Sequence, residues 1–356
     1  MNYNRGMKLT CALIFLFAAL FLLRETVHKR YFDFSTIPQN RKELRILLLH
    51  RKGVGEQESL ARLQTACQNL GWECYIASSK LTFWEKLSLF RPLEKIYEKL
   101  QPDFTINFQS LDRVSPGVTF VSLSNLPPNL DIQKLDRFDG ILATFGDLSA
   151  LKACKPPIIR WYFTCPSRPF QPHEPSRIFY CGSNWDATRR GVEYKRLFSL
   201  LNQRNDFELY GPPNAWKEMA HSYRGFLPYD GKSLIRAIEN CGIALLLHSE
   251  SHIKNHSPTS RIFESSAAGC IILSDRHPFI LKEFGDSILY IDQTQDPETI
   301  YAQIDAHLHW IRSNPEAAIQ KAADAHRIFE ERFTLEKQLV DLKRLFEEIS
   351  HTPTLE

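Results

Sequence analysis

The chain lacks a marked excess of charge of either sign. Among its 356 residues, 44 are Lys or Arg and 41 are Asp or Glu, which gives a net charge of +3. Such a balance excludes a basic coat for nucleic acid and an acidic tail, although it permits a local anion site. We therefore expect no nucleic-acid partner. Proline (20) and glycine (15) are also too few for a collagen-like or low-complexity chain.

Closely spaced cysteines are absent as well. No two of the eight cysteines are separated by two residues, which excludes the zinc-knuckle and thioredoxin spacings. The cysteines are scattered and mostly lie in apolar runs, as Cys270 does before Ile-Ile-Leu. We expect buried free thiols in a reducing compartment, rather than a disulfide framework or a metal site.

Hydrophobic side chains, in contrast, are plentiful. They make up 43% of the chain, and aromatic residues make up 12%. This composition argues against disorder, and the length suggests about two domains that can bury cores without disulfide or metal support.

The N-terminal region contains an uncharged run at residues 9–23. As a helix this run would measure about 22 Å, which is short for a hydrocarbon core of about 30 Å. Because Arg24 follows directly and no small-x-small pattern is present, we predict an uncleaved membrane anchor. A removed leader and an in-plane hairpin are the alternatives. Lys and Arg are more numerous after the run than before it, which predicts a cytoplasmic location for the large C-terminal part.

The first half of the chain begins with a strand-helix-strand pattern. Residues 46–49 form a continuous apolar run, residues 60–70 repeat apolar side chains at helical spacing, and residues 73–77 predict the next strand. This unit predicts a Rossmann-like domain. We expect it to continue with one helix and four strands, at residues 92–100, 104–108, 118–123, 140–143 and 158–163.

A dinucleotide fingerprint is incomplete after the first strand. Gly53 and Gly55 have the required spacing, but Glu58 stands where the third glycine belongs, which argues against an NAD site. The glycines favour a loop that lets the backbone approach a ligand, or a simple tight turn. His50 ends the first strand, where open α/β sheets bind ligands, so it is the candidate for a catalytic base. A solvated or hydrogen-bonded loop histidine is the alternative.

Prolines recur at every third position from Pro166 to Pro175. This period fits polyproline II and excludes a helix or a central strand. We interpret residues 165–176 as a semi-rigid spacer between two domains, with a proline-rich ligand for a partner as the alternative. Two α/β segments of similar size on either side of a spacer predict a ligand cleft between them.

The second half repeats the alternation of strands and helices. Apolar strands are expected at residues 177–181, 207–210, 242–247 and 270–274, and helices at 233–239 and 261–268. A polar loop is expected over residues 248–260. The predicted fold class is therefore α/β, with two Rossmann-like domains facing a cleft.

The segment from Pro258 to Gly269 is the most specific feature of the sequence. Thr259 or Ser260 can cap the following helix, whose free N–H groups and dipole attract anions, and Arg261 adds a fork of donors for phosphate. Glu264 lies one turn further on the same helix face, where its carboxylate can accept from a vicinal diol such as that of ribose. This layout suits a nucleotide sugar. The alternative is a surface salt bridge between residues three apart on a helix.

The stretch from residue 180 to residue 292 resembles the C-terminal domain of group-1 glycosyltransferases with the GT-B fold. It is closest to the spore-maturation-protein type, and exostosins have a similar segment. The matching pieces are Tyr180-Cys-Gly-Ser183 with Arg190, Leu209-Tyr-Gly211, and Ser260-Arg-x-Phe-Glu264-x5-Cys-Ile-Ile-Leu-Ser-Asp275. The first half is similar to these enzymes in its pattern alone.

The resemblance implies roles for individual residues. In such families the second glutamate of a Glu-x7-Glu pair binds ribose, and Glu264 occupies that place. The first glutamate falls at His256, a departure that leaves the contact with the donor sugar and the stereochemistry open. Arg190 and Arg261 would hold the diphosphate. The full set of donor-site candidates is Gly182, Ser183, Asn184, Arg190, Tyr210, His256, Thr259, Ser260, Arg261 and Glu264.

The C-terminal region predicts helices. Asn314 and Pro315 form a helix start, and apolar residues at helical spacing after Thr334 mark an amphipathic helix. The resemblance implies that this last helix crosses back to the first domain. A short coiled coil is the alternative.

Taken together, these features predict a membrane-anchored glycosyltransferase that moves a sugar from a nucleotide-diphosphate donor to an envelope or lipid-linked glycan. The resemblance implies a metal-independent reaction with the nucleotide sugar as co-substrate and no other cofactor. A catalytically silent scaffold with the same fold and a sugar-nucleotide epimerase are the alternatives. The predicted segments are an anchor and stalk, an acceptor-side domain, a linker, a donor-side domain and terminal helices, at residues 1–43, 44–164, 165–176, 177–315 and 316–356.

Overall fold

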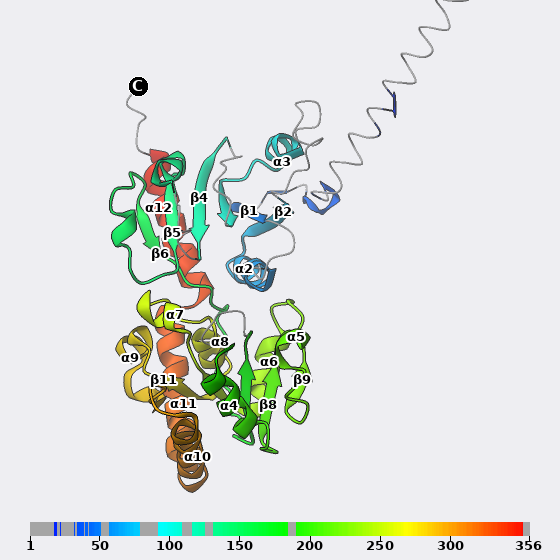
Figure 1. Ribbon diagram of the computed structural model, residues 1–356. Coiled ribbons are helices and arrows are strands. Elements are labelled where there is room, and N and C mark those ends of the chain that lie inside the picture. Colours follow the sequence, from blue (N-terminus) through cyan, green and yellow to red (C-terminus); the bar gives the residue numbers. More distant parts are fainter. Residues whose placement is uncertain are drawn as a thin grey trace, which may run out of the picture.

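The computed structural model contains two α/β domains that face each other and a helical C-terminal segment that runs along both (Figure 1). The structure describes residues 18–19, 22, 32, 34–38, 40–41, 43–50, 57–78, 92–108, 116–124, 131–183 and 190–351. Nearly all of the predicted anchor, residues 9–23, therefore lies outside the described residues. Within the described part of the chain, no helix has the length and apolar character needed to span a bilayer.

The N-terminal domain has six strands in the order β2-β1-β3-β4-β5-β6, all parallel. Alternate side chains of the first strand point to opposite faces. Ile46 and Leu48 pack toward helix α2 (Gln57–Asn69), while Leu47 and Leu49 pack toward α3 (Pro92–Leu100), so both faces are covered. The strands are β1 (Arg45–His50), β2 (Glu73–Ser78), β3 (Phe104–Phe108), β4 (Val118–Leu123), β5 (Gly140–Ala143) and β6 (Ile158–Arg160).

The C-terminal domain repeats this plan with six parallel strands in the order β12-β11-β10-β7-β8-β9. Its strands are β7 (Arg177–Cys181), β8 (Phe207–Tyr210), β9 (Tyr223–Gly225), β10 (Gly242–Leu246), β11 (Ile271–Asp275) and β12 (Leu289–Ile291). Helices α4 (Val192–Leu201) and α10 (Pro297–Ser313) cover one face, and α6 (Ser233–Cys241), α8 (Arg261–Ala267) and α9 (Pro278–Phe284) cover the other. The chain order reverses between β7 and β10, which makes this pair the switch point of the sheet.

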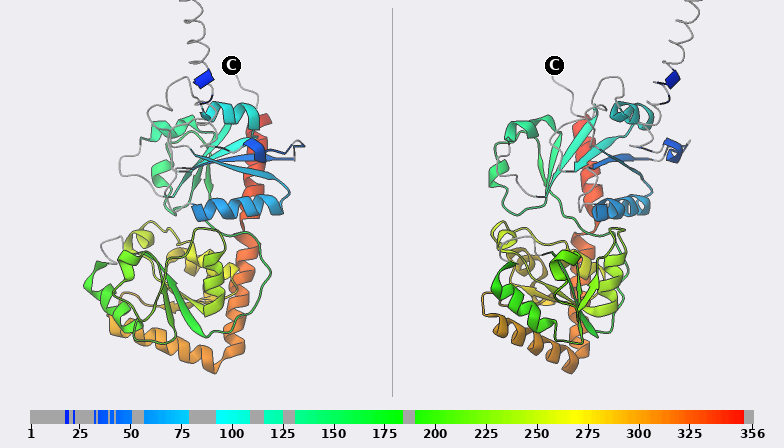
Figure 2. Two further views of the ribbon diagram at one scale, coloured as in Figure 1. Left: turned by 90° about the vertical axis from the view of Figure 1, so that its right-hand side faces the viewer. Right: turned by 45° about the vertical axis from the view of Figure 1, so that its right-hand side comes forward.

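Two long helices close the molecule. Helix α11 (Pro315–Arg332) packs on the C-terminal domain, whereas α12 (Leu335–His351) packs against α2 of the N-terminal domain (Figure 2). The chain passes between the domains twice, through the extended segment 165–176 and again between α11 and α12. These two crossings are hydrogen-bonded to each other. The Leu335 amide donates to the Cys165 carbonyl at 2.9 Å, and the Tyr162 amide donates to Gln338 Oε1 at 2.7 Å.

Local differences from the sequence-based expectations occur near the domain boundary. The expected polar loop at 248–260 contains a short helix, α7 (Glu250–Lys254), which begins after Ser249, whose hydroxyl accepts from the His252 amide. The strand expected over 158–163 ends at Arg160, because the chain there leaves the sheet and turns toward the second domain. Of the two predicted caps of α8, Ser260 has helical backbone angles and makes no capping side-chain bond. The Arg261 amide donates to Thr259 Oγ1 instead, at 3.5 Å.

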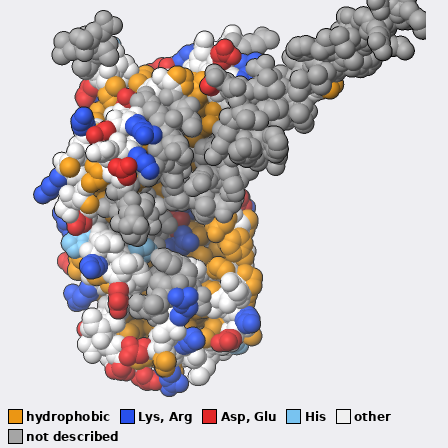
Figure 3. Space-filling model, turned by 45° about the horizontal axis from the view of Figure 1, so that its top comes forward, with side chains coloured by type: hydrophobic (Ala, Val, Ile, Leu, Met, Phe, Trp, Pro, Cys, Tyr) orange, Lys and Arg blue, Asp and Glu red, His pale blue; other side chains and the backbone are white. Residues whose placement is uncertain are grey.

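The surface agrees with the balanced composition. On the face shown in Figure 3, basic and acidic side chains are interspersed and do not gather by sign. No extended basic surface is visible on this face.

Candidate functional site

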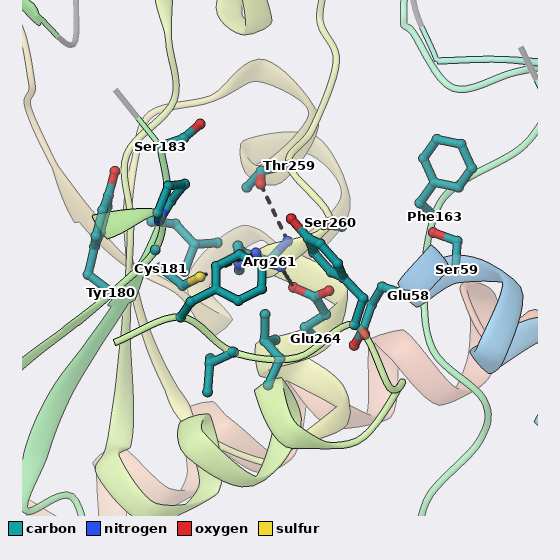
Figure 4. A pocket seen from close by; sticks show the side chains of 18 of the residues that line it. Glu58, Ser59, Phe163, Tyr180, Cys181, Ser183, Thr259, Ser260, Arg261 and Glu264 are labelled. Atoms are coloured by element: carbon teal, nitrogen blue, oxygen red, sulfur yellow. Dashed lines mark hydrogen bonds and ion pairs between the residues drawn. The ribbon is translucent and has the colours of Figure 1, made fainter. Parts of the chain in front are cut away.

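A cleft of about 370 Å³ lies between the two domains, at the carboxyl ends of β7 and β10. This is the switch point of the C-terminal sheet, where open α/β sheets bind ligands. The N-terminal domain contributes residues from α2 and from the segment after β6 (Figure 4). The described wall consists of Glu58, Ser59, Arg62, Phe163, Tyr180, Cys181, Gly182, Ser183, Gly211, Pro212, Phe226, Leu227, Pro228, Tyr229, Leu234, Leu245, Leu246, Leu247, His252, Thr259, Ser260, Arg261 and Glu264.

A buried network of four charges forms the floor of this cleft. Glu264 is 1% exposed, and its Oε1 accepts from Arg62 Nη1 at 2.6 Å across the domain boundary. Its Oε2 accepts from Arg261 Nη1 on the same helix. Arg62 also donates through Nη2 to Glu58 at 2.6 Å. The second oxygen of Glu58 accepts from the Gly231 amide at 2.8 Å, so this carboxylate crosses the boundary too.

The electrostatics of the network keep Glu264 ionised. Burial alone would raise the pKa of its carboxyl, but the guanidinium groups of Arg261 and Arg62 outweigh burial and lower that pKa below its ordinary value. Two cations and two carboxylates make the network neutral, which is how buried charges are tolerated. Glu264 therefore offers a fixed, charged acceptor at the floor of the cleft.

A second buried pair holds the loop that leads into α8. His248 Nδ1 and Asp275 Oδ1 are 2.8 Å apart, and both side chains are inaccessible to solvent. His248 Nε2 accepts from the Thr259 amide at 3.1 Å, which requires the tautomer with its proton on Nδ1, facing the carboxylate. The pair thus fixes Thr259 and the two residues that follow it along the cleft wall.

Six of the residues predicted from the sequence meet in this cleft. They come from the end of β7 and from the start of α8, segments far apart in the sequence, and they are Gly182, Ser183, Thr259, Ser260, Arg261 and Glu264. The side chain of Arg261 is 24% exposed and lies on the cleft wall.

The structure places the other candidates elsewhere. Arg190 is exposed just before α4, and the Tyr210 hydroxyl donates to Glu208 at 2.8 Å, outside the described wall of the cleft. His256 has a positive φ of 51° and its Cβ lies beside Gly146 of the N-terminal domain. His50 is 5% exposed at the end of β1, and burial lowers its pKa. Asn184 lies outside the described residues.

Sequence reasoning missed the contribution of the N-terminal domain. Glu58 entered only as the residue that breaks a glycine pattern, and Arg62 was not singled out. A signal was available, because the two residues are four apart and therefore share one face of a helix. Sequence reasoning also missed an apolar wall at 226–229. Phe226 and Tyr229 are half exposed there, and their ring centroids are 5.2 Å apart. Exposed aromatic faces of this kind suit stacking with a planar base.

A second cavity of about 690 Å³ adjoins the cleft. The two share Phe163, His252, Thr259 and Ser260, and the second is lined from both domains. Its N-terminal side includes Thr144, Phe145, Asp147 and Tyr162, and its C-terminal side includes residues of α7 and the loop after it. Two joined compartments can hold two reactants at once. Among the described residues, no cluster of three or more His, Cys, Asp or Glu side chains is arranged to hold a metal ion.

Two Rossmann-like domains with a cleft between them and a last helix that returns to the first domain define a GT-B-like fold. Residues 189–344 match the family model described as "Glycosyl transferase-like". A sequence search of curated proteins gives no match. The resemblance to group-1-like GT-B glycosyltransferases is thus confirmed, whereas the narrower likeness to spore-maturation proteins and exostosins stays a prediction.

Solved structures share the fold over nearly the whole chain. A glycosyltransferase from Rickettsia africae ESF-5 has a TM-score of 0.57 at 11% identity, covering 88% of this chain and 100% of that one. Sucrose-phosphate synthase from Thermosynechococcus elongatus has a TM-score of 0.54 at 11% identity, covering 86% and 99%. Anabaena HepE in complex with UDP-glucose has a TM-score of 0.53 at 12% identity, covering 86% and 100%. At these identities the similarity establishes the fold alone.

Proposed function

We propose that the protein transfers a sugar from a nucleotide-diphosphate donor to a glycan or lipid-linked acceptor. The observation that supports this most directly is the buried Arg62–Glu264–Arg261 network at the switch point of the C-terminal sheet, inside a cleft that opens to both domains. A nucleotide sugar has a planar base, a diol and a diphosphate, and each of these would find a matching group on this wall.

In this proposal the donor lies along the C-terminal side of the cleft. The apolar wall at 226–229 would take the base, and Glu264 would accept from the ribose hydroxyls. Arg261, with Ser183 and Ser260 on the same wall, would bind the diphosphate. The solved complex of the Anabaena protein with UDP-glucose makes UDP-glucose the first donor to test.

The chemistry would be electrostatic. When the bond to the sugar breaks, negative charge develops on the leaving diphosphate, and a cation already fixed beside it lowers the barrier. Arg261 is held by Glu264 and Cys181, so it needs little reorganisation during the reaction. We propose, on the resemblance to GT-B enzymes, that no bound metal is required. Activity that survives EDTA would agree with this, and activity that EDTA abolishes would contradict it.

The acceptor would occupy the adjoining cavity. His50, the sequence-based candidate for a catalytic base, is not on the described wall of either compartment, so the proposal assigns it no step. The acceptor is a saccharide-bearing molecule in this proposal, because the cavity combines aromatic rings with hydroxyl and amide groups.

A donor screen tests the proposal. Thermal shift and calorimetry with UDP-, GDP-, ADP- and dTDP-sugars should identify at least one ligand that stabilises the protein. Arg261→Met should weaken its binding by about 10- to 100-fold, since one charge-assisted contact to phosphate is lost. Arg344→Met, which removes an exposed arginine on α12, is the control and should bind normally. Absence of binding by any donor would refute the proposal.

The same screen separates the alternatives. A silent scaffold is favoured by the position of His256, which lies beside Gly146 and not on the cleft wall. It would bind a donor without hydrolysis or transfer. An epimerase would interconvert donor sugars without an acceptor, which product NMR would detect.

We further propose, from the sequence alone, that residues 9–23 anchor the protein in a membrane and that the two domains lie in the cytoplasm. Protease protection in sealed vesicles of defined orientation tests both points. Release of the protein by a high-salt wash would contradict the anchor.

A further inference from the structure

Arg62 belongs to the N-terminal domain, yet its side chain ends in the donor side of the cleft. It projects from α2 and is 3% exposed, and it contacts Glu264 of the other domain at 2.6 Å. Its own helix supplies Glu58, four residues earlier, which binds the second nitrogen of the guanidinium. Arg62 is therefore fixed from both sides and cannot rotate away without breaking two buried ion pairs.

Glu264 depends on this contact for its orientation. Each of its two oxygens accepts from a different arginine, Arg62 from across the boundary and Arg261 from its own helix. A carboxylate oxygen can accept two hydrogen bonds, so each oxygen retains the capacity to accept one more, such as one from a ligand hydroxyl. The two arginines fix the direction in which that further bond can form. With Arg62 absent, the carboxylate could turn about its last bond toward Arg261 alone.

A closed arrangement of the domains is needed for the contact. Gly231, on the loop before α6, lies so close to α2 that an added Cβ would be 3.3 Å from Ala61 Cβ, and its amide donates to Glu58. Both carboxylates of the network thus make hydrogen bonds across the boundary. Separation of the domains would break the contact of Arg62 with Glu264 and that of the Gly231 amide with Glu58 at the same time.

We propose that Arg62 is a positioning residue of the donor site, which orients the ribose-binding carboxylate of Glu264 from the opposite domain and thereby makes donor affinity depend on domain closure. This inference rests on the proposed function, because it assigns Arg62 to the contact between Glu264 and ribose. Arg62 acts through Glu264 and is not assigned a contact with the reacting atoms.

The test compares nucleotides with and without the diol. Calorimetry first measures UDP, ADP and GDP on the full-length protein, and then the 2′,3′-dideoxy analogue of the tightest of them. We expect the natural nucleotide to bind at least about tenfold more tightly than its dideoxy analogue, because a site built to accept from hydroxyls rejects a ligand without them. In Arg62→Met this preference should shrink about tenfold, through weaker binding of the natural nucleotide, while the dideoxy affinity stays the same.

Two further variants separate the role of Arg62 in binding from a general loss of stability. Arg62→Lys keeps the charge but not the fork of donors, so it should recover part of the preference. Arg45→Met is the matched control, because Arg45 makes an equally buried ion pair with Glu73 at 2.7 Å, entirely within the N-terminal domain. It should lower stability and leave the preference for the diol unchanged.

The outcomes are distinct. A diol preference in Arg62→Met equal to that of the wild type overturns the inference and leaves the proposed function intact. If Arg62→Met does not fold, Arg62→Lys and Glu58→Gln decide in its place, and an undiminished preference in both overturns the inference. Failure of the wild type to bind any of the three nucleotides overturns this inference, and the wider donor screen then decides the proposed function separately.

A readout without nucleotide tests closure directly. Small-angle scattering should show a larger radius of gyration for ligand-free Arg62→Met than for the wild type and Arg45→Met. Equal radii for all three proteins would contradict the dependence on closure.

Discussion

The two domains share one sheet architecture but contribute to the cleft in different ways. The C-terminal domain uses its switch point, between β7 and β10, and a single short segment at the start of α8. The N-terminal domain reaches the same cleft from the side of a helix, through Glu58 and Arg62. The first contribution is a local motif, whereas the second exists only in the folded protein. For a site between two domains, the sequence can therefore predict the residues of a local motif but not those that the other domain contributes.

The largest effect is expected from Glu264→Gln, which removes a charge shared by both domains. Buried Arg62 and partly buried Arg261 would each lose a partner, and breaking a buried pair from one side costs about 3–5 kcal/mol of unfolding free energy. Donor binding should be lost as well. Glu208→Gln is the control, because Glu208 is also buried and pairs with Arg177 but lies outside the described cleft wall. Urea denaturation with donor titration measures both, and donor binding by Glu264→Gln would contradict the comparison.

Leu339→Ala tests the attachment of α12 to the N-terminal domain. Leu339 is fully buried among side chains of α2 and the first sheet. Truncation of a buried leucine costs about 2–5 kcal/mol through lost burial and the cavity left behind. Ile304→Ala, equally buried in the C-terminal core, is the matched variant. If the domains unfold separately, calorimetry should show two transitions, and each variant should lower the melting temperature of a different one. A single transition lowered equally in both variants would indicate one cooperative unit.

A smaller effect concerns acid stability of the C-terminal domain. Burial, together with nearby His248, lowers the pKa of His277 to about 4. A histidine with a lowered pKa in the folded state stabilises the protein above its unfolded pKa of about 6.5 and loses that contribution as the pH falls toward 4. The loss should reach about 3 kcal/mol, since one pKa unit corresponds to about 1.4 kcal/mol. Urea denaturation between pH 7 and 4 should show a flatter profile for His277→Asn, and an unchanged slope would refute the assignment.

The sequence predicted the strands well where apolar runs were continuous. The run at residues 46–49 is buried on both faces, and the matching run at 271–273 is buried in the same way, because helices cover both sides of each sheet. Parallel sheets impose this pattern, so their strands can be recognised without knowledge of their partners. The likeness of residues 180–292 to one family had the same origin, since its residues lie close together in the chain.

The remaining features depend on contacts that no local pattern specifies. Helix α7 was missed because its residues are polar and its length is only five. Arg62 and Glu264 are 202 positions apart, so their pairing depends on how the domains are placed. Tyr210 was a candidate through the family resemblance at residues 209–211, but its hydroxyl is taken by Glu208 of the same strand. A resemblance in sequence does not reveal which way a side chain turns.

The joined crossings between the domains have a consequence for substrate entry. Because the segment at Cys165 and the start of α12 are hydrogen-bonded to each other, the polypeptide links the two lobes at one place and not at two separate ones. Such a link can act as one hinge and limits how far the lobes can separate. Reactants can thus enter and leave when one lobe rotates away from the other. Rotation back about the same hinge restores the contact between Arg62 and Glu264.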